Sequence, residues 1–191
     1  MRARIFLLSL IPIYGCTSTP EIVECENISH SEKTNTFILP SKKTCNTTVS
    51  LKKNTSYVLS ATLSDDWADG DKYEELRRPA LDESGWVVGQ LPWFAQGITL
   101  VEPFRRCPNG RWFEIIGEVK QPSGPPIKYR LGQGMRDKKV FFYNGPDDGR
   151  LMIYANDLNC RYENNIGEMT MSVRLATEEE ITRKEKFPTC E

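Results

Sequence analysis

The feature that most constrains the fold is a strict alternation of apolar and polar residues near the C-terminal end. The apolar residues, which we expect to face a core, are Met169, Met171, Val173 and Leu175. The polar residues, which we expect to face solvent, are Glu168, Thr170, Ser172 and Arg174. A period of two places alternate side chains on opposite faces of a strand. The segment therefore predicts an antiparallel sheet with one face in water.

Shorter segments repeat this pattern and are separated by residues typical of turns. The predicted strands cover 57–63, 113–119, 127–131, 139–143 and 150–155. Residues 144–149, with the sequence NGPDDG, lie between the last two and predict a hairpin turn. Several short strands with such punctuation predict an all-β fold, a β-sandwich.

The regions around this sheet pattern have different compositions. Residues 16–50 are rich in Thr, Ser, Asn and Lys and predict an irregular N-terminal arm or tether before a sandwich domain at 51–176. Residues 69–97 predict a long loop with a short helix around 72–78. Residues 177–191 begin with TEEE, which matches a capping box, and predict a short polar helix and a tail.

The N-terminus predicts export. Arg2 and Arg4 precede a short apolar stretch that ends before Cys16, so residues 1–15 are predicted to be a signal peptide. The order Ile-Tyr-Gly-Cys resembles a bacterial lipobox, which predicts lipidation at Cys16 and a membrane anchor. The expected location is the bacterial outer membrane or periplasm, or the medium if Cys16 carries no lipid. With 25 Lys and Arg against 26 Asp and Glu, the charge does not favour nucleic-acid binding.

The chain has 6 cysteines and no CxxC pair, which favours disulfides in an oxidising compartment over zinc. If Cys16 is lipidated, five thiols remain, and otherwise three bridges are available. Several pairings are open: Cys25 and Cys45 within the arm, Cys190 with the arm, and Cys107 with Cys160. The last pair would brace the loop that follows residue 156.

That loop, residues 157–167, is rich in side-chain oxygens and joins two predicted strands. Calcium binds six to eight oxygens from carboxylates, amides, backbone carbonyls and water. Asp157 offers a carboxylate, and Asn164 and Asn165 offer amide oxygens. The alternative is an Asx-rich turn without an ion, since Asn and Asp form such turns unaided.

This part of the chain resembles the calcium-dependent galactophilic bacterial lectins of the PA-I type. The resemblance rests on LMIYAND at 151–157, on YENNIG at 162–167 and on the alternating strand after it, with Trp67-Ala68 and residues 110–117 fitting in order. It covers about 56–175 and implies a jelly-roll-like β-sandwich with calcium in this loop.

The resemblance also implies which residues bind the calcium ion and the sugar. The implied calcium ligands are the side chains of Asp157, Asn164 and Asn165 and the carbonyls of Arg161 and of Gly70 or a neighbour. Vicinal hydroxyls of a sugar would complete the coordination, and the implied sugar contacts are Asp157, Asn164 and Arg161.

Two departures from the family pattern concern its sugar contacts. The family uses a His and a Gln, and residues 56–191 contain no histidine. Arg161 replaces a small hydroxyl residue, so its cation would clash with a sugar or select an anionic one.

We therefore expect a calcium-dependent lectin-like lipoprotein that binds a glycan or glycoconjugate. It is not expected to be an enzyme, since no nucleophile and base are paired. The alternative is a non-catalytic interaction or structural lipoprotein with a degenerate lectin-like fold that binds a protein. Formation of a homo-oligomer stays open.

Overall fold

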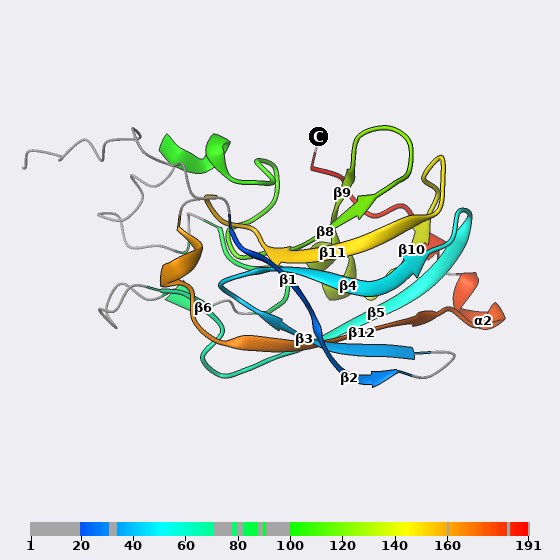
Figure 1. The fold of residues 1–191 in the computed structure, drawn as a ribbon, viewed down its shortest axis with the longest axis horizontal. Helices are drawn as coiled ribbons and strands as arrows, with labels where there is room; N and C mark the ends of the chain where they lie inside the picture. The colour runs from blue at the N-terminus through cyan, green and yellow to red at the C-terminus, as the bar shows by residue number, and fades with distance from the viewer. Residues whose placement is uncertain are drawn as a thin grey trace, which may run out of the picture.

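The computed structural model describes residues 20–30, 34–70, 78–79, 82–87, 90, 100–159, 161–182 and 184–190. Within these residues the chain forms two large β-sheets stacked as layers, and Figure 1 shows the two layers from the side. Two short α-helices, α1 (Leu131–Arg136) and α2 (Glu178–Ile181), accompany them. The predicted all-β sandwich is confirmed.

One layer is a five-stranded sheet in the order β1-β4-β11-β8-β9. Its strand bounds are β1 (Ile22–Glu24), β4 (Thr44–Leu51), β11 (Gly149–Ala155), β8 (Ile115–Lys120) and β9 (Ile127–Arg130). The β1–β4 pair is parallel, and the other pairs are antiparallel.

The other layer is a six-stranded sheet in the order β13-β10-β5-β12-β3-β2. Its strand bounds are β13 (Lys184–Glu185), β10 (Val140–Tyr143), β5 (Thr55–Leu63), β12 (Glu168–Leu175), β3 (Thr34–Pro40) and β2 (Glu26–His30). Only its β10–β13 pair is parallel among the described strands. A small separate ladder joins β6 (Ala68–Asp69) to β7 (Arg78–Pro79).

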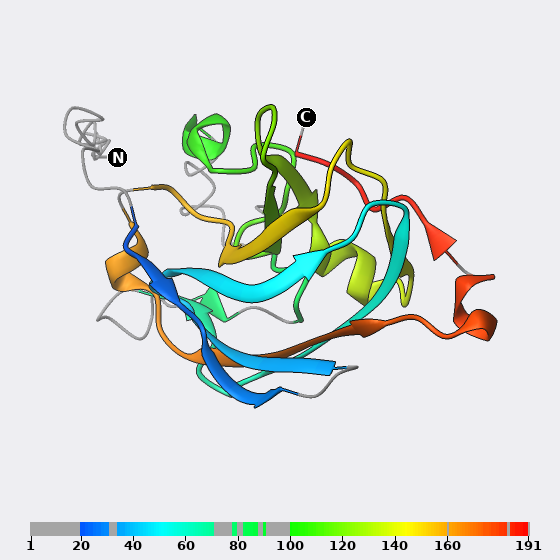
Figure 2. The ribbon, with the colours of Figure 1, turned by 45° about the vertical axis from the view of Figure 1, so that its right-hand side comes forward.

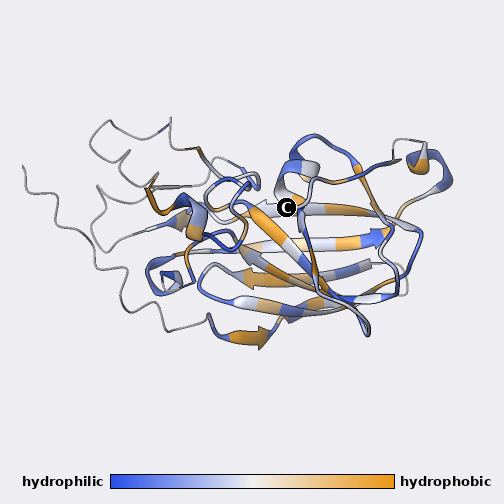
Figure 3. Ribbon diagram, turned by 90° about the horizontal axis from the view of Figure 1, so that it is seen from above, coloured by the Kyte–Doolittle hydropathy of each residue, from blue (hydrophilic) through white to orange (hydrophobic). Residues whose placement is uncertain are grey.

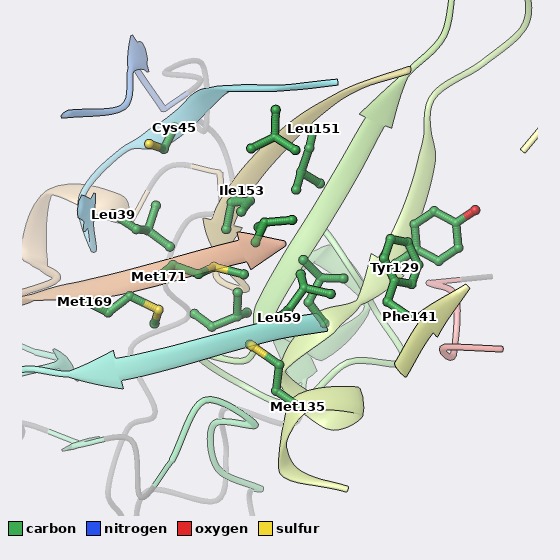
Figure 4. Close-up of a cluster of buried hydrophobic side chains, with 14 of the residues drawn as sticks. Leu39, Cys45, Leu59, Tyr129, Met135, Phe141, Leu151, Ile153, Met169 and Met171 are labelled. Carbon is green, nitrogen blue, oxygen red and sulfur yellow. The ribbon is translucent and has the colours of Figure 1, made fainter. Parts of the chain in front are cut away.

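The core lies between the two layers and is formed by the inward residues of both (Figure 4). Leu151 and Ile153 of β11 lie across from Met169 and Met171 of β12, with Leu59 of β5 beside them. In Figure 3 the hydrophobic colour falls mainly on the strands and the hydrophilic colour mainly on the connections. Burial of this apolar surface supplies most of the stabilisation of such a fold.

The strand that led to the fold assignment behaves largely as predicted. Met169, Met171 and Val173 in β12 are buried, and the polar residues between them are more exposed. Leu175 departs from the pattern: it is the last residue of the strand and is 52% exposed. β5, β9, β10 and β11 also form close to their predicted positions.

The N-terminal region differs from its prediction. Instead of an irregular arm, the described residues between 22 and 51 form β1 to β4, and β3 and β4 are interior strands of the two sheets. The sequence did not predict β4 because some of its buried residues are polar. Thr44 and Thr47 are buried, and the Thr47 hydroxyl donates to the Leu151 carbonyl at 2.7 Å. The sandwich therefore begins well before residue 51.

The predicted hairpin at 144–149 is also wrong. β10 lies in the six-stranded sheet and β11 in the five-stranded sheet, so this turn carries the chain from one layer to the other. The turn itself is well made, with the Tyr143 hydroxyl donating to the Asp147 carbonyl at 2.7 Å. Turn residues specify a reversal, but they do not specify which strands pair.

The C-terminal helix prediction is confirmed in α2, where Thr177 and Glu180 form the capping box. The sequence did not predict α1, whose two glycines disfavour a helix. Gly134 is required there by packing, because a Cβ atom would overlap the ring of buried Phe187. No helix in the described part of the chain is long and apolar enough to cross a membrane.

Two disulfides are present among the described cysteines. Cys25 bonds to Cys45, which matches one of the pairings considered. Cys107 bonds to Cys190, so neither the link from Cys190 to the arm nor the pairing of Cys107 with Cys160 forms. The signal peptide, Cys16, Cys160 and residues 72–77 of the predicted helix lie outside the described residues.

Candidate functional site

The candidate site is the connection between β11 and β12, which contains the 3-10 helix η4 (Tyr162–Asn164). It lies at the end of the sandwich opposite α2, as Figure 2 and Figure 1 both show. The chain leaves the five-stranded sheet after Ala155 and enters the six-stranded sheet at Glu168. The loop therefore bridges the two layers.

The start of the loop is held by the buried side chain of Asn156. Its amide oxygen accepts from the Cys107 backbone N–H at 2.9 Å. Its amide nitrogen donates to the carbonyls of Cys107 and Arg111 at 2.9 and 2.8 Å. The Cys107–Cys190 disulfide ties the same segment to the C-terminal end. Asn156 thus fixes where the next residue, Asp157, emerges.

A second contact holds η4 against the five-stranded sheet. Tyr162 is buried, and its hydroxyl donates to the Ala155 carbonyl. The Arg106 guanidinium lies 3.2 Å from the centroid of the Tyr154 ring and 5.8 Å from that of Tyr162. The Arg106 backbone N–H also donates to the Asp157 carbonyl at 3.2 Å. The loop is therefore supported by packing and not only by its own turns.

Asp157 is the carboxylate of the site and is 2% exposed. Its Oδ1 accepts from the Leu158 backbone N–H at 2.6 Å, while its Oδ2 has no hydrogen-bond partner among the described residues. Burial raises the pKa of Asp157 to about 6, although the Leu158 N–H, the Asn165 amide and the charges of Arg161 and Arg105 act to lower it. A buried carboxylate oxygen without a donor is costly.

Asn164 and Asn165 present the same situation with amide oxygens. The Asn164 Nδ2 donates to Asp69 at 3.4 Å, and the Asn165 Nδ2 donates to the Ser41 carbonyl at 3.2 Å. Each Oδ1 is buried and has no partner in the described part of the chain. The hydrogen bonds of the two Nδ2 atoms thus orient both side chains, and the two Oδ1 atoms have no hydrogen-bond donor among the described residues.

A second segment of chain lies against this loop. Ala68 and Ile166 exchange two backbone hydrogen bonds, at 3.0 and 3.1 Å, and so bring Gly70 next to Asn164. A Cβ atom on Gly70 would lie 3.3 Å from the Asn164 carbonyl oxygen. Gly167 has φ +83°, and a Cβ atom there would strike the Trp67 backbone. The segment at 67–70 is therefore packed closely against the loop, and the role of the Gly70 carbonyl as a ligand stays a prediction.

Arg161 is exposed, and its backbone carbonyl accepts from the Asn164 N–H at 3.3 Å. Its carbonyl thus belongs to the loop, whereas its guanidinium extends toward solvent. Sequence reasoning missed Ser41, which lies between β3 and β4. The Ser41 hydroxyl is buried without a partner among the described residues, and its backbone N–H donates to the Gly167 carbonyl at 3.1 Å. The only available signal was a polar residue in a segment taken for a tether.

The predicted site residues are therefore neighbours along one loop and the segment paired with it. They supply one carboxylate oxygen and two amide oxygens that are buried and unpartnered. No group of three or more His, Cys, Asp or Glu side chains that could hold a metal occurs in the described residues. The amide oxygens of Asn and the backbone carbonyl oxygens also coordinate hard cations, and they are not among these four side-chain types.

Comparisons with known proteins returned no relative for this chain. No protein-family model, no curated protein and no solved structure matches it.

Proposed function

We propose that this chain is an exported, non-enzymatic, calcium-dependent carbohydrate-binding protein whose ion site is the loop between β11 and β12. One observation carries the proposal. The side-chain oxygens of Asp157, Asn164 and Asn165, which sequence reasoning selected as calcium ligands, are buried and without partners in the described part of the chain. Buried polar atoms are normally satisfied, so each exception calls for a partner such as an ion or a water molecule.

The chemistry of these atoms fits calcium. Calcium takes oxygen ligands, and amide and carboxylate oxygens are common among them. The backbone carbonyls of Arg161 and Gly70 would add two more. A bound calcium ion would supply a positive charge with coordination positions left for further oxygens. The chain's part is to orient the oxygens, through the Nδ2 hydrogen bonds of the two asparagines.

The ligand class follows from charge and coordination. Among the proposed ligands only Asp157 is charged, so these ligands alone would leave a divalent cation with positive charge and able to take further oxygens from outside; Asp69 accepts from Asn164 and is not one of the proposed ligands. A pair of neighbouring sugar hydroxyls meets this need, with contacts to Asp157 and Asn164. The exposed Arg161 adds a second positive charge beside the loop, which favours a sugar with a carboxylate, such as a sialic or uronic acid.

The proposed place of action is outside the cytoplasm. Two disulfides among the described cysteines are typical of an oxidising compartment and accord with the leader at 1–15. In this proposal Cys16 carries the lipid that holds the protein at the bacterial outer membrane, and the membrane and a glycan are its partners.

A second function, binding of a protein by a degenerate lectin-like domain, is favoured by one sequence fact. The chain has a single histidine, His30 in β2, so no histidine is available near the loop for the sugar contact made in the PA-I type. Under this alternative the ion, if bound, would only be structural.

Thermal unfolding of the full chain with calcium and with a chelator tests the first step. At a calcium concentration 100 times Kd, binding adds about 2.7 kcal/mol to the free energy of unfolding. For a chain of this length we expect Tm to rise by roughly 5 °C or more. Asp157→Ala and Asn164→Ala should abolish the rise. Glu163→Ala, which removes an exposed carboxylate from the same loop, is the matched control and should keep it.

A glycan array probed with the calcium-loaded full chain tests the second step. Signals that disappear with chelator support the lectin function. A calcium-dependent Tm without any array signal favours the protein-binding alternative. No calcium-dependent change in Tm would contradict the proposed site.

A further inference from the structure

We propose that Phe104 is a ligand-contacting residue that stacks on the C–H-rich face of the sugar bound at the loop between β11 and β12. The inference rests on the proposed carbohydrate-binding function and deepens it. It assigns a contact that no calcium ligand can make, and it defines the substrate class as a pyranose with one apolar ring face.

Phe104 lies next to the candidate site through backbone pairing. Arg105 forms an antiparallel bridge with Leu158, and the next residue, Arg106, donates its N–H to the Asp157 carbonyl at 3.2 Å. Phe104 therefore directly precedes the two residues that pair with the start of the loop. In both ribbon views the short 3-10 helix at 100–104 lies on the same side of the molecule as the connection that follows β11 (Figure 1, Figure 2).

The ring is exposed, although the backbone that carries it is firmly held. Phe104 is 57% exposed, whereas the following Arg105 is 7% exposed. The Arg105 side chain donates to the Glu102 carbonyl at 3.2 Å and to the Pro108 carbonyl at 2.7 Å. Its guanidinium also lies 4.8 Å from the ring centroid of buried Trp112. Phe104 is thus presented to solvent by an anchored turn.

Position and aromatic character together distinguish Phe104 from other exposed apolar residues, since Leu100 in the same segment is 77% exposed but has no ring. Single apolar side chains on a surface are common and need no explanation. Leu175 is similarly exposed at 52% but lies at the end of β12 that is remote from the candidate loop. Binding sites combine aromatic walls with a few oriented polar groups, and an anchored ring loses little freedom on contact. Phe104 adds an exposed aromatic ring to the segment that pairs with the start of the Asp157 loop.

The test titrates four sugars into the calcium-loaded full chain: methyl galactoside, methyl mannoside, glucuronic acid and N-acetylneuraminic acid. For each sugar that binds, Phe104→Ala should weaken Kd by about tenfold. Phe104→Trp should retain the affinity, and Phe104→Leu should recover only part of it, because it restores bulk without a flat π-face. Leu175→Ala is the matched control and should leave Kd unchanged. The calcium-dependent rise in Tm should be unaltered in all four variants.

The same samples provide a direct readout by NMR. Ring protons of a sugar stacked on Phe104 should shift upfield with the wild-type chain and not with Phe104→Leu. Equal Kd values for wild type and Phe104→Ala, with calcium and sugar both bound, would overturn this inference and leave the carbohydrate-binding function intact. Calcium binding without binding of any of the four sugars would overturn the inference, and the array would then decide the proposed function separately.

Discussion

Glu114 and Asp157 are two buried carboxylates whose hydrogen-bond partners differ. Glu114 directly precedes β8, and Asp157 follows shortly after β11, the strand paired with β8. Glu114 is fully buried and accepts from Arg130 at 3.0 Å and from the backbone N–H groups of Arg111 and Gln133 at 2.7 and 3.1 Å. Asp157 has one local donor, and its second oxygen has no partner among the described residues.

The difference separates a structural carboxylate from a candidate functional one. Burial raises the pKa of both groups. At Glu114 the backbone N–H groups of Arg111 and Gln133 and the charge of Arg130 counteract it, and at Asp157 the Leu158 N–H, the Asn165 amide and the charges of Arg161 and Arg105 do so. Glu114 ties the start of β8 to α1, and nothing further is required of it. The Asp157 loop instead leaves one carboxylate oxygen without a hydrogen-bond donor among the described residues, so the desolvation cost of this group is offset only in part. Such a cost is expected where a site is organised for a partner from outside.

The contrast between Glu114 and Asp157 can be tested by substitution. We expect the largest loss in the free energy of unfolding from Glu114→Ala, measured with a chelator so that the chain is metal-free. Arg130 would lose its buried partner, so we expect the free energy of unfolding to fall by about 3–5 kcal/mol. Asp157→Ala under the same conditions should cost far less, because little holds that carboxylate in the metal-free state. Urea unfolding of both variants measures the two changes.

Glu114→Gln is the control for shape, since it keeps an acceptor oxygen for backbone donors and loses the charge. Its loss should be smaller than that of Glu114→Ala. If Asp157→Ala destabilises the metal-free chain as much as Glu114→Ala does, the contrast fails and Asp157 is a structural residue.

A smaller effect concerns pH. The pKa of Asp157 is raised to about 6 in the folded chain, so the folded state binds a proton that the unfolded state has already lost. The metal-free chain should therefore lose stability as pH rises from about 4 to about 6, by at most about 3 kcal/mol. Unfolding curves across this range measure the slope. Asp157→Asn, which cannot ionise, should flatten the part of the slope that Asp157 causes.

Calcium should act most strongly above this range, because only the ionised carboxylate is a good ligand. The calcium-dependent rise in Tm should shrink as pH falls below about 6. A rise that is independent of pH between 4 and 7 would show that Asp157 does not bind the ion.

The smallest effect is expected from Arg161→Ala. The exposed Arg161 would contribute its backbone carbonyl to the ion, and a substitution preserves that atom. We expect the free energy of unfolding to change by about 0.5 kcal/mol or less and the calcium response in Tm to persist. A variant that loses the response would show that the Arg161 guanidinium supports its neighbouring carboxylate, as that of Arg130 supports Glu114.

The sequence predicted those parts of the fold in which periodicity and burial coincide. β12 alternates strictly between apolar and polar residues and lies between β3 and β5 at the middle of its sheet. Met169, Met171 and Val173 face the core, so the sequence pattern predicted the strand correctly. β4 is equally interior but buries hydrogen-bonded threonines, and hydropathy could not mark it. The turn at 144–149 shows a different limit, because local turn residues carry no information about which layer receives the next strand.

The candidate site was predictable where its residues follow one another in a single loop. Asp157, Asn164 and Asn165 could be selected as oxygen donors from their types and spacing. Their missing partners could not be predicted, since that property depends on Asn156 and Ser41 and on the segment at 67–70 packed against the loop. Phe104 was missed because only the pairing of Arg105 with Leu158 brings it near.

The placement of Cys25 has a mechanical consequence. β1 is an edge strand of the five-stranded sheet, and β2 is an edge strand of the six-stranded sheet. Cys25 lies between β1 and β2 and is bonded to Cys45 in β4. A pulling force applied at Pro20 would peel off the three residues of β1 and then pass through the covalent bond directly into β4. This path bypasses β2 and β3, so these two strands of the six-stranded sheet would be shielded from tension applied on the N-terminal side.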